Sequence, residues 1–194
     1  MTISADDLVE RLSGLRQPVV AALLEAQANA LNSGAEIDPE PIQRDASGMI
    51  VRKGPLSLPQ RGDLATSRDG RTVIRRVEAE SGPGFKPFPA YNGPDFSAEI
   101  HPFAWDHAVL DMRSNQSDPS WTALRHWFLE WFQTRPNDLS PELSGAIHEL
   151  QGPWRAPGRW RAIVDFGSAP PTCVPGLIAA VAQSGCESIK ISAE

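Results

Sequence analysis

The sequence predicts an α+β fold in which a mixed, mainly antiparallel sheet packs against helices. Two observations indicate this class. Amphipathic helical patterns occupy the N-terminal 34 residues and a tryptophan-rich segment at 118–134. The last fifty residues follow the order hairpin, helix, strand, which implies a strand–helix–strand crossover onto a parallel neighbour.

The chain of 194 residues suits one domain spanning 1–194. We divide it into a helical part (1–34), a proline-rich connector (35–62) and a part that carries the sheet, the tryptophan-rich helix and the C-terminal hairpin, helix and strand (63–194). Two cysteines are too few for a disulfide scaffold and suggest reduced thiols. The N-terminus resembles no secretory signal, and no apolar run could span a membrane, so we expect a cytoplasmic protein with no membrane partner.

The N-terminal segment has helical spacing. Ser4 followed by Asp7 fits a helix N-cap with acids in the first turn. Leucines then recur every three to four residues, and Pro18 interrupts the pattern because it has no backbone N–H to donate. We therefore expect two helices, the second over 18–32, or one kinked helix.

Residues 33–95 contain short predicted elements separated by prolines and glycines. Residues 33–62 contain four prolines, and only "GMIVRK" at 48–53 has the pattern of a strand. "RTVIRRVEA" at 71–79 follows an "RDGR" turn and predicts a strand of a hairpin. Residues 81–95 read as a Pro/Gly-rich loop. It carries three aromatic residues suited to a contact surface, Phe85, Phe88 and Tyr91.

The segment 118–134 is the clearest helix. Asp118 would cap it and Pro119 would take its first position. Its large apolar side chains fall within an arc of about 140° at helical periodicity. They are Trp121, Leu124, Trp127, Phe128, Trp131 and Phe132, and we expect them in the core.

The C-terminal third predicts a hairpin from "GAIHELQGP" and "RWRAIVDFG", joined by a "RAPGR" turn. The second of these strands is apolar on both faces, as a central strand is. "VPGLIAAVAQSG" then predicts a helix that starts at Pro175 and stops at Gly185, and "CESIKIS" a closing strand.

The stretch "IHPFAWDHAVLD" at 100–111 holds two histidines and two aspartates. In a strand, His101 and His107 would lie about 20 Å apart, too far to share an ion. In a helix, His107 and Asp111 would be neighbours, but two ligands are fewer than zinc requires. We therefore expect core with polar edges, and no metal site.

A sharper candidate for chemistry is "DFGSAPPTCVPG" at 165–176, which joins a strand to a helix N-terminus. The helix dipole could lower the pKa of Cys173, with His148 as its base and Asp165 orienting that base. The alternative is a small buried cysteine. The loop has no dinucleotide or phosphate-loop motif, so we expect no cofactor. "PWRAPGRWR" interleaves tryptophan and arginine, but we prefer inward-packed tryptophans to nucleic-acid binding.

The net charge of −6 is unevenly distributed. Residues 1–51 carry eight acids and three bases, whereas 52–86 carry eight bases and four acids. The basic segment could bind phosphate, although a solvated face is the simpler interpretation. The overall acidity favours a basic protein partner. The residues that we expect to contact it are Glu36, Asp38, Glu40, Phe85, Phe88, Tyr91 and Asp95.

The C-terminal "GAIHEL…RWRAIVDFGSAPP…GLIAAVAQSGCESIKI" resembles the small single-domain immunity proteins of bacterial toxin systems. This resemblance implies a non-catalytic protein that neutralises a cognate toxin or effector with a cytoplasmic target. Two alternatives stay open. One is a small thiol-dependent hydrolase or transferase that uses Cys173 and His148. The other is a structural or regulatory subunit whose proline-rich loops, 33–62 and 81–95, clasp a partner.

Overall fold

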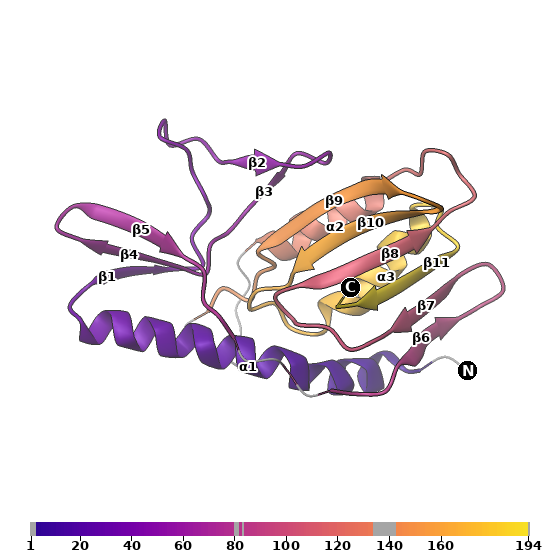
Figure 1. Ribbon diagram of the computed structural model, residues 1–194, viewed down its shortest axis with the longest axis horizontal. Coiled ribbons are helices and arrows are strands. Elements are labelled where there is room, and N and C mark those ends of the chain that lie inside the picture. Colours follow the sequence, from indigo (N-terminus) through magenta and orange to yellow (C-terminus); the bar gives the residue numbers. More distant parts are fainter. Residues whose placement is uncertain (1–2, 80–81, 83, 134–142, 194) are drawn as a thin grey trace.

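The structure, a computed structural model, describes residues 3–79, 82, 84–133 and 143–193 (Figure 1). Within these residues, three helices and eleven strands form antiparallel sheets and a mixed sheet packed against helices. The α+β class predicted from the sequence is confirmed. No helix in this described part is both long and apolar enough to cross a bilayer.

The main sheet has six strands in the order β6-β7-β11-β8-β10-β9. Only β7 and β11 pair in parallel, so the sheet is mixed and mainly antiparallel, as expected. The strands are β6 (Phe88–Asn92), β7 (Ser97–Ile100), β8 (Ala108–Arg113), β9 (Glu149–Ala156), β10 (Arg159–Asp165) and β11 (Ser188–Ser192).

The C-terminal crossover runs from β10 through α3 (Cys173–Gln183) to β11. Both strands are antiparallel to β8, which lies between them, so they are parallel to each other. The predicted strand–helix–strand unit is therefore present. The helix begins two residues before Pro175, because the N–H of Cys173 already bonds the carbonyl of Pro170 at 3.0 Å.

The sheet has one covered face and one open face. α2 (Thr122–Phe132) and α3 lie behind it in Figure 1, and the opposite face looks toward the viewer. One cross-strand row on the covered face is fully buried: Ala162, Leu110, Ile191 and Ile100. Since side chains alternate along a strand, the intervening positions point to the open face.

A single helix, α1 (Ala5–Asn32), replaces the two helices or kinked helix expected from Pro18. The Ser4 hydroxyl accepts the N–H of Asp7 at 3.1 Å, as the predicted N-cap requires. Apolar side chains at helical spacing stay buried on both sides of Pro18, including Leu15 and Val19. Their packing holds the helix together where the proline lacks its hydrogen bond.

A smaller sheet, ordered β1-β4-β5, lies along the C-terminal half of α1 (Figure 1). Its strands are β1 (Glu36–Pro39), β4 (Leu64–Arg68) and β5 (Arg71–Arg75), and a separate pair is formed by β2 (Arg52–Lys53) and β3 (Leu58–Pro59). Asp69 and Gly70 both have positive φ in the β4–β5 turn, so the "RDGR" hairpin is confirmed. The connector 33–62 has more strand than its prolines suggested.

Two local predictions were wrong. Residues 81–95 are not all loop, because they include β6 at the edge of the sheet. An edge strand tolerates Pro89, which has no backbone N–H to donate to a neighbouring strand. Residues 81 and 83 lie outside the described residues. The tryptophan-rich helix starts at Thr122 rather than after Asp118. Trp121 instead packs edge-on against Trp160, with ring centroids 5.4 Å apart, and this contact holds the chain before the helix.

Candidate functional site

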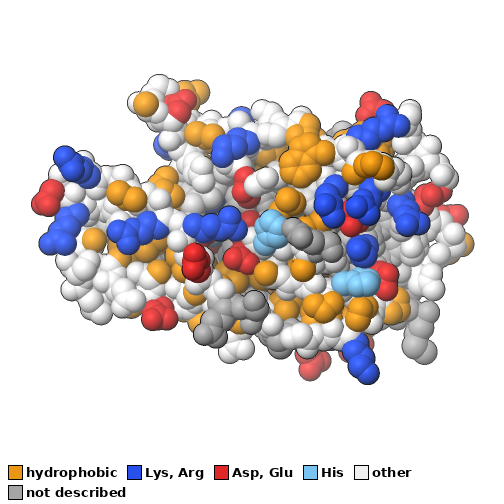
Figure 2. All heavy atoms as spheres, in the orientation of Figure 1, with side chains coloured by type: hydrophobic (Ala, Val, Ile, Leu, Met, Phe, Trp, Pro, Cys, Tyr) orange, Lys and Arg blue, Asp and Glu red, His pale blue; other side chains and the backbone are white. Residues whose placement is uncertain are grey.

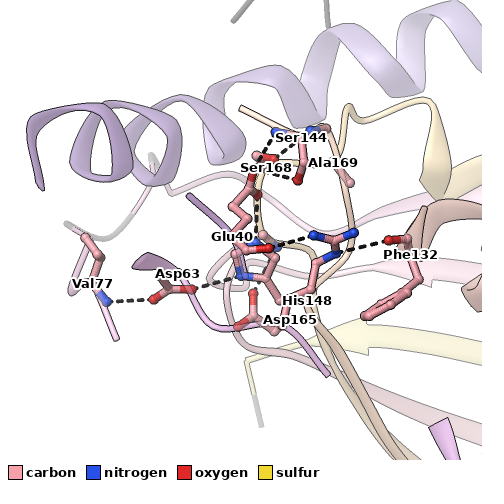
Figure 3. Close-up of polar contacts among 12 residues, drawn as sticks. Glu40, Asp63, Val77, Phe132, Ser144, His148, Asp165, Ser168 and Ala169 are labelled. Carbon is pink, nitrogen blue, oxygen red and sulfur yellow. Dashed lines mark hydrogen bonds and ion pairs between the residues drawn. The ribbon is translucent and has the colours of Figure 1, made fainter. Parts of the chain in front are cut away.

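Four segments that are distant in sequence meet at His148 (Figure 3). Each functional side chain lies at or next to a strand end. Glu40 follows β1, Asp63 precedes β4, His148 precedes β9 and Asp165 ends β10. Two backbone hydrogen bonds hold these segments together. The N–H of His148 donates to the carbonyl of Asp165 at 3.0 Å, and the carbonyl of His148 accepts the N–H of Arg61 at 3.0 Å.

The imidazole of His148 is held between two carboxylates. Its Nε2 lies 2.7 Å from Oε1 of Glu40, and its Nδ1 lies 2.8 Å from Oδ1 of Asp63. A carboxylate accepts hydrogen bonds, so both ring nitrogens donate and the ring is an imidazolium. The exposed fraction of the side chain is 1% for His148 and 0% for Glu40. The group is therefore a buried, charge-assisted triad.

The pKa values in this cluster follow from its contacts. Burial opposes the charge on His148, but the hydrogen bonds to Asp63 and Glu40 outweigh it and raise the pKa to about 10. Burial also opposes the charge on Glu40, yet the bonds from His148, Ser144 and Ser168 lower its pKa to about 2. For Asp165, burial wins over the attraction of His148, and the pKa rises to about 6.

Two arginines tie the surrounding loops to the cluster. Arg61 donates to the carbonyl of Glu40 at 2.6 Å and to that of Phe132 at 3.1 Å. Arg16, from α1, donates to the carbonyls of Ser168 and Ala169. These bonds connect α1, the connector and the loop after β10 into one network. Arg61 also lines a cavity of about 230 Å³, to which Asp63 and Asp165 of the cluster contribute as well.

Glu40 occupies a strained backbone position, with φ of 50° between Pro39 and Pro41. A non-glycine residue rarely adopts this region, and it does so where the surroundings impose it. The second carboxylate oxygen of Glu40 accepts the N–H and hydroxyl of Ser144. The hydrogen bonds of the cluster hold the strained residue in place.

Gly167 permits the position of the His148 ring. Its φ is 51°, and a Cβ placed there would lie 2.2 Å from Cδ2 of His148. Its N–H donates to the Asp165 carboxylate at 2.9 Å. Only glycine gives both this backbone conformation and this approach.

Asp63, His148 and Asp165 also form the one group of three potential metal ligands within the described residues, with ligand atoms all within 4.8 Å. The sequence had predicted no metal site. A cation here would have to replace the proton on Nδ1 of His148, which a pKa of about 10 opposes. The charge of Glu40 is also balanced by the two nearby arginines, Arg16 and Arg61. The geometry fits a proton better than an ion.

The thiol chemistry proposed for Cys173 does not fit the structure. Cys173 does start α3, but burial raises the pKa of its thiol well above the usual range instead of lowering it. Both nitrogens of His148 are bonded to carboxylates, so neither is left to serve as the base. Asp165 does lie beside His148, as predicted, but Glu40 and Asp63 orient the ring. The alternative of a small buried cysteine is the one that the structure supports.

We therefore expect iodoacetamide near neutral pH to label neither cysteine in the folded protein. Cys173 is fully buried, and burial raises the pKa of Cys186 to about 11, so the reactive thiolate is scarce at both. Mass spectrometry of labelled peptides should show slow modification, which becomes fast in urea. Rapid labelling of Cys173 in native conditions would restore the enzyme hypothesis.

Comparisons with family models, with curated proteins and with solved structures found no match. Function must therefore be inferred from the residues themselves.

The predicted partner residues do not form one surface. Glu40 and Phe88 are buried, Glu40 in the cluster and Phe88 in the core, so their assignment to a contact surface was wrong. Glu36 and Asp38 are exposed on β1, whereas Tyr91 on β6 and the exposed Asp95 after it lie at the other end of the molecule (Figure 1). Phe85 is half-buried against Phe88, at 5.6 Å between ring centroids.

The open face of the main sheet carries a second polar cluster. Cross-strand register places Trp154, Arg161, Asp111, Lys190 and Glu99 in one row. The carboxylate of Asp111 is largely buried and forms two ion pairs. Its Oδ1 lies 3.2 Å from Nε of Arg161, and its Oδ2 lies 3.8 Å from Nζ of Lys190. Arg159 adds a third cation at 3.1 Å. Figure 2 shows Lys and Arg side chains, in blue, gathered over this part of the sheet.

The exposed fraction of Trp154 is 42%, although we had expected the tryptophans of "PWRAPGRWR" to pack inward. Trp160 does so in part, against Trp121. The difference follows from the register, because Trp154 lies opposite Arg161 and shares its face. Sequence alone did not reveal on which side of the hairpin each tryptophan would lie.

Several residues of the His148 cluster were missed. Asp63 and Arg61 stand in no periodic pattern, and their partners are distant in sequence. Arg16 did carry a signal, because it lies on the buried face of α1, four residues after Leu12 and four before Val20. One signal was available for Glu40, because it stands between two prolines. No other acid of the connector is flanked by proline on both sides. The missed residues are Arg16, Arg61, Asp63, Ser144 and Ser168.

Proposed function

We propose that this is a non-catalytic protein-binding protein that contacts its partner through the open face of the six-stranded sheet. The observation that carries the proposal is the exposed Trp154 beside the three cations around Asp111. Tryptophan and arginine are the residue types that most often dominate binding energy at protein interfaces. The non-catalytic part is supported by His148, since both of its ring nitrogens are hydrogen-bonded to carboxylates.

The sheet face favours an acidic contact surface on the partner. Three cations surround one largely buried carboxylate, so positive charge remains at the surface. Exposed Arg113 lies on the same face, and exposed Glu99 is the acid at its far side. The expectation of a basic partner came from the net charge and stays a prediction for the rest of the surface.

The partner class that we propose is a toxin or effector acting in the cytoplasm. The segment that resembles immunity proteins is the last fifty residues, and Trp154, Arg161 and Lys190 all belong to it. An immunity protein needs only a tight complementary surface, which is consistent with a face of tryptophan and arginine.

The test is co-expression with the products of neighbouring reading frames. A toxin expressed alone should stop growth, and this protein should restore it by forming a stoichiometric complex. Trp154→Ala should weaken that complex by about tenfold to a hundredfold, because a truncated central tryptophan loses most of its buried contact. Arg161→Glu should act in the same direction by placing a second acid beside Asp111. Titration calorimetry with the purified pair measures both.

Tyr91→Ala is the matched control, since this aromatic is similarly exposed, at 41%, but lies on β6. It should leave the affinity unchanged. A complex weakened by Tyr91→Ala and insensitive to Trp154→Ala would move the interface to the 81–95 segment and reject the sheet face. If this protein restores growth against no toxic neighbouring product, the immunity proposal is rejected.

A further inference from the structure

A groove of about 530 Å³ lies between the C-terminal half of α1 and the small sheet. One wall is a helix face of small residues, Ala26, Asn29, Ala30 and Ser33. The other wall is the sheet face that carries Leu64, Thr66 and Arg68 at alternate positions of β4, with Arg75 opposite Leu64. Small side chains on the helix leave the space open.

The groove is strongly cationic. Arg68, Arg75 and Arg76 line it, and no carboxylate does so among the described residues. Arg68 and Arg75 form no ion pair with any residue that the structure describes, in a protein whose net charge is −6. Arg76 is partly engaged, because it donates to the carbonyl of Asp106 at 3.3 Å and its charge also acts on Asp165. Figure 2 shows Lys and Arg side chains along the part of the molecule that β4 and β5 occupy.

The geometry points to a binding site for a small organic phosphate in this groove. Arginine presents a planar fork of N–H donors that matches two phosphate oxygens, and the lining of this groove contains arginine but no competing carboxylate. Asn29, Ser33 and Thr66 add neutral hydrogen-bonding groups. Ala26, Ala30, Leu64 and Val77 supply an apolar wall for the organic part of the ligand.

This site is separate from the proposed protein interface. It lies against α1 and the β4–β5 hairpin, whereas the interface lies on β8, β9, β10 and β11. The sequence predicts a solvated face for the basic segment 52–86, and the proposed site gives three of its arginines a specific role.

Calorimetric titration of the full chain with phenyl phosphate and with inorganic phosphate, at physiological ionic strength, tests the site. We expect saturable one-to-one binding, with phenyl phosphate tighter because its ring contacts the apolar wall. Arg68→Gln and Arg75→Gln should each weaken phenyl phosphate binding about tenfold or more. Both arginines are exposed, so their replacement should leave the thermal unfolding temperature nearly unchanged.

Two further variants separate a defined site from diffuse attraction. Ala26→Phe fills the groove without removing charge and should abolish binding. Arg52→Gln removes an exposed arginine of β2 outside the groove and should not change it. The proposal is overturned if neither phosphate saturates at millimolar concentration, if inorganic phosphate binds as tightly as phenyl phosphate, or if Ala26→Phe binds like the wild type.

Discussion

Replacement of His148 by glutamine should lower the free energy of unfolding by about 3–5 kcal/mol. The reason is that His148 is the cation between two carboxylates, one of which, Glu40, is fully buried. Glutamine fills similar space but carries no charge, so both acids lose their counter-ion. Removing one member of a buried ion pair costs more than the pair contributes, because an uncompensated charge remains.

The loss should depend on pH in a specific direction. The pKa of His148 is raised in the folded protein to about 10. The stabilisation from its charge is therefore complete below its ordinary pKa of 6.5 and is lost as the pH rises from there to about 10. The gap in unfolding free energy between wild type and His148→Gln should narrow across that range. On the acid side, the contribution of Glu40 is lost between pH 4.5 and about 2.

Urea unfolding at several pH values measures the effect, and two controls make it specific. His107→Gln removes an exposed imidazole and should change stability by less than about 0.5 kcal/mol. Combining Glu40→Gln with His148→Gln should cost less than the sum of the two single changes, because the double variant no longer buries an unpaired Glu40 charge. Strict additivity, or a pH-independent gap, would mean that the ring and carboxylates do not act as one unit.

Apart from the continuity of α1 through Pro18, the helical segments, the β4–β5 and β9–β10 hairpins and the C-terminal crossover could be predicted from the sequence because they arise from local signals. Leucine spacing marks α1 and tryptophan spacing marks α2, while the Asp69–Gly70 pair specifies a hairpin turn. The helix start at Thr122 and the strand β6 could not be predicted. Both depend on tertiary contacts, the first on Trp121 against Trp160 and the second on pairing with β7.

Less of the candidate site than of the fold could be predicted from the sequence. His148 and Asp165 were predicted to lie close together because they flank one predicted hairpin, and they do, although Asp165 does not orient the ring. Glu40 and Asp63 come from the connector and from the strand that follows it, and no periodicity links them to residue 148. The same limit explains the error at Cys173, where a helix N-terminus suggested a reactive thiol but burial decides its pKa. Local patterns do not report burial by distant segments.

Gly167→Ala should destabilise the protein by about 3 kcal/mol or more, through two effects that act together. An alanine at φ of 51° costs about 1 kcal/mol in backbone strain. Its Cβ would also lie 2.2 Å from Cδ2 and 2.5 Å from Nε2 of His148, a contact that the ring can relieve only by moving. Such movement breaks the hydrogen bonds to Glu40 and Asp63, so most of the cost is electrostatic.

Gly158→Ala separates the two effects, because its φ is 70° and no atom lies within 4 Å of the added Cβ. It should show the backbone cost alone, about 1 kcal/mol in the urea midpoint analysis. If the excess cost of Gly167→Ala comes from the displaced imidazole, this variant should also lose the fall in stability from pH 6.5 to 10, whereas Gly158→Ala should keep it. Equal costs for the two alanines would show that the ring does not lie against Gly167. A large cost with the pH dependence retained would show that the imidazolium survives the clash, so that packing and not charge fixes this end of the sheet.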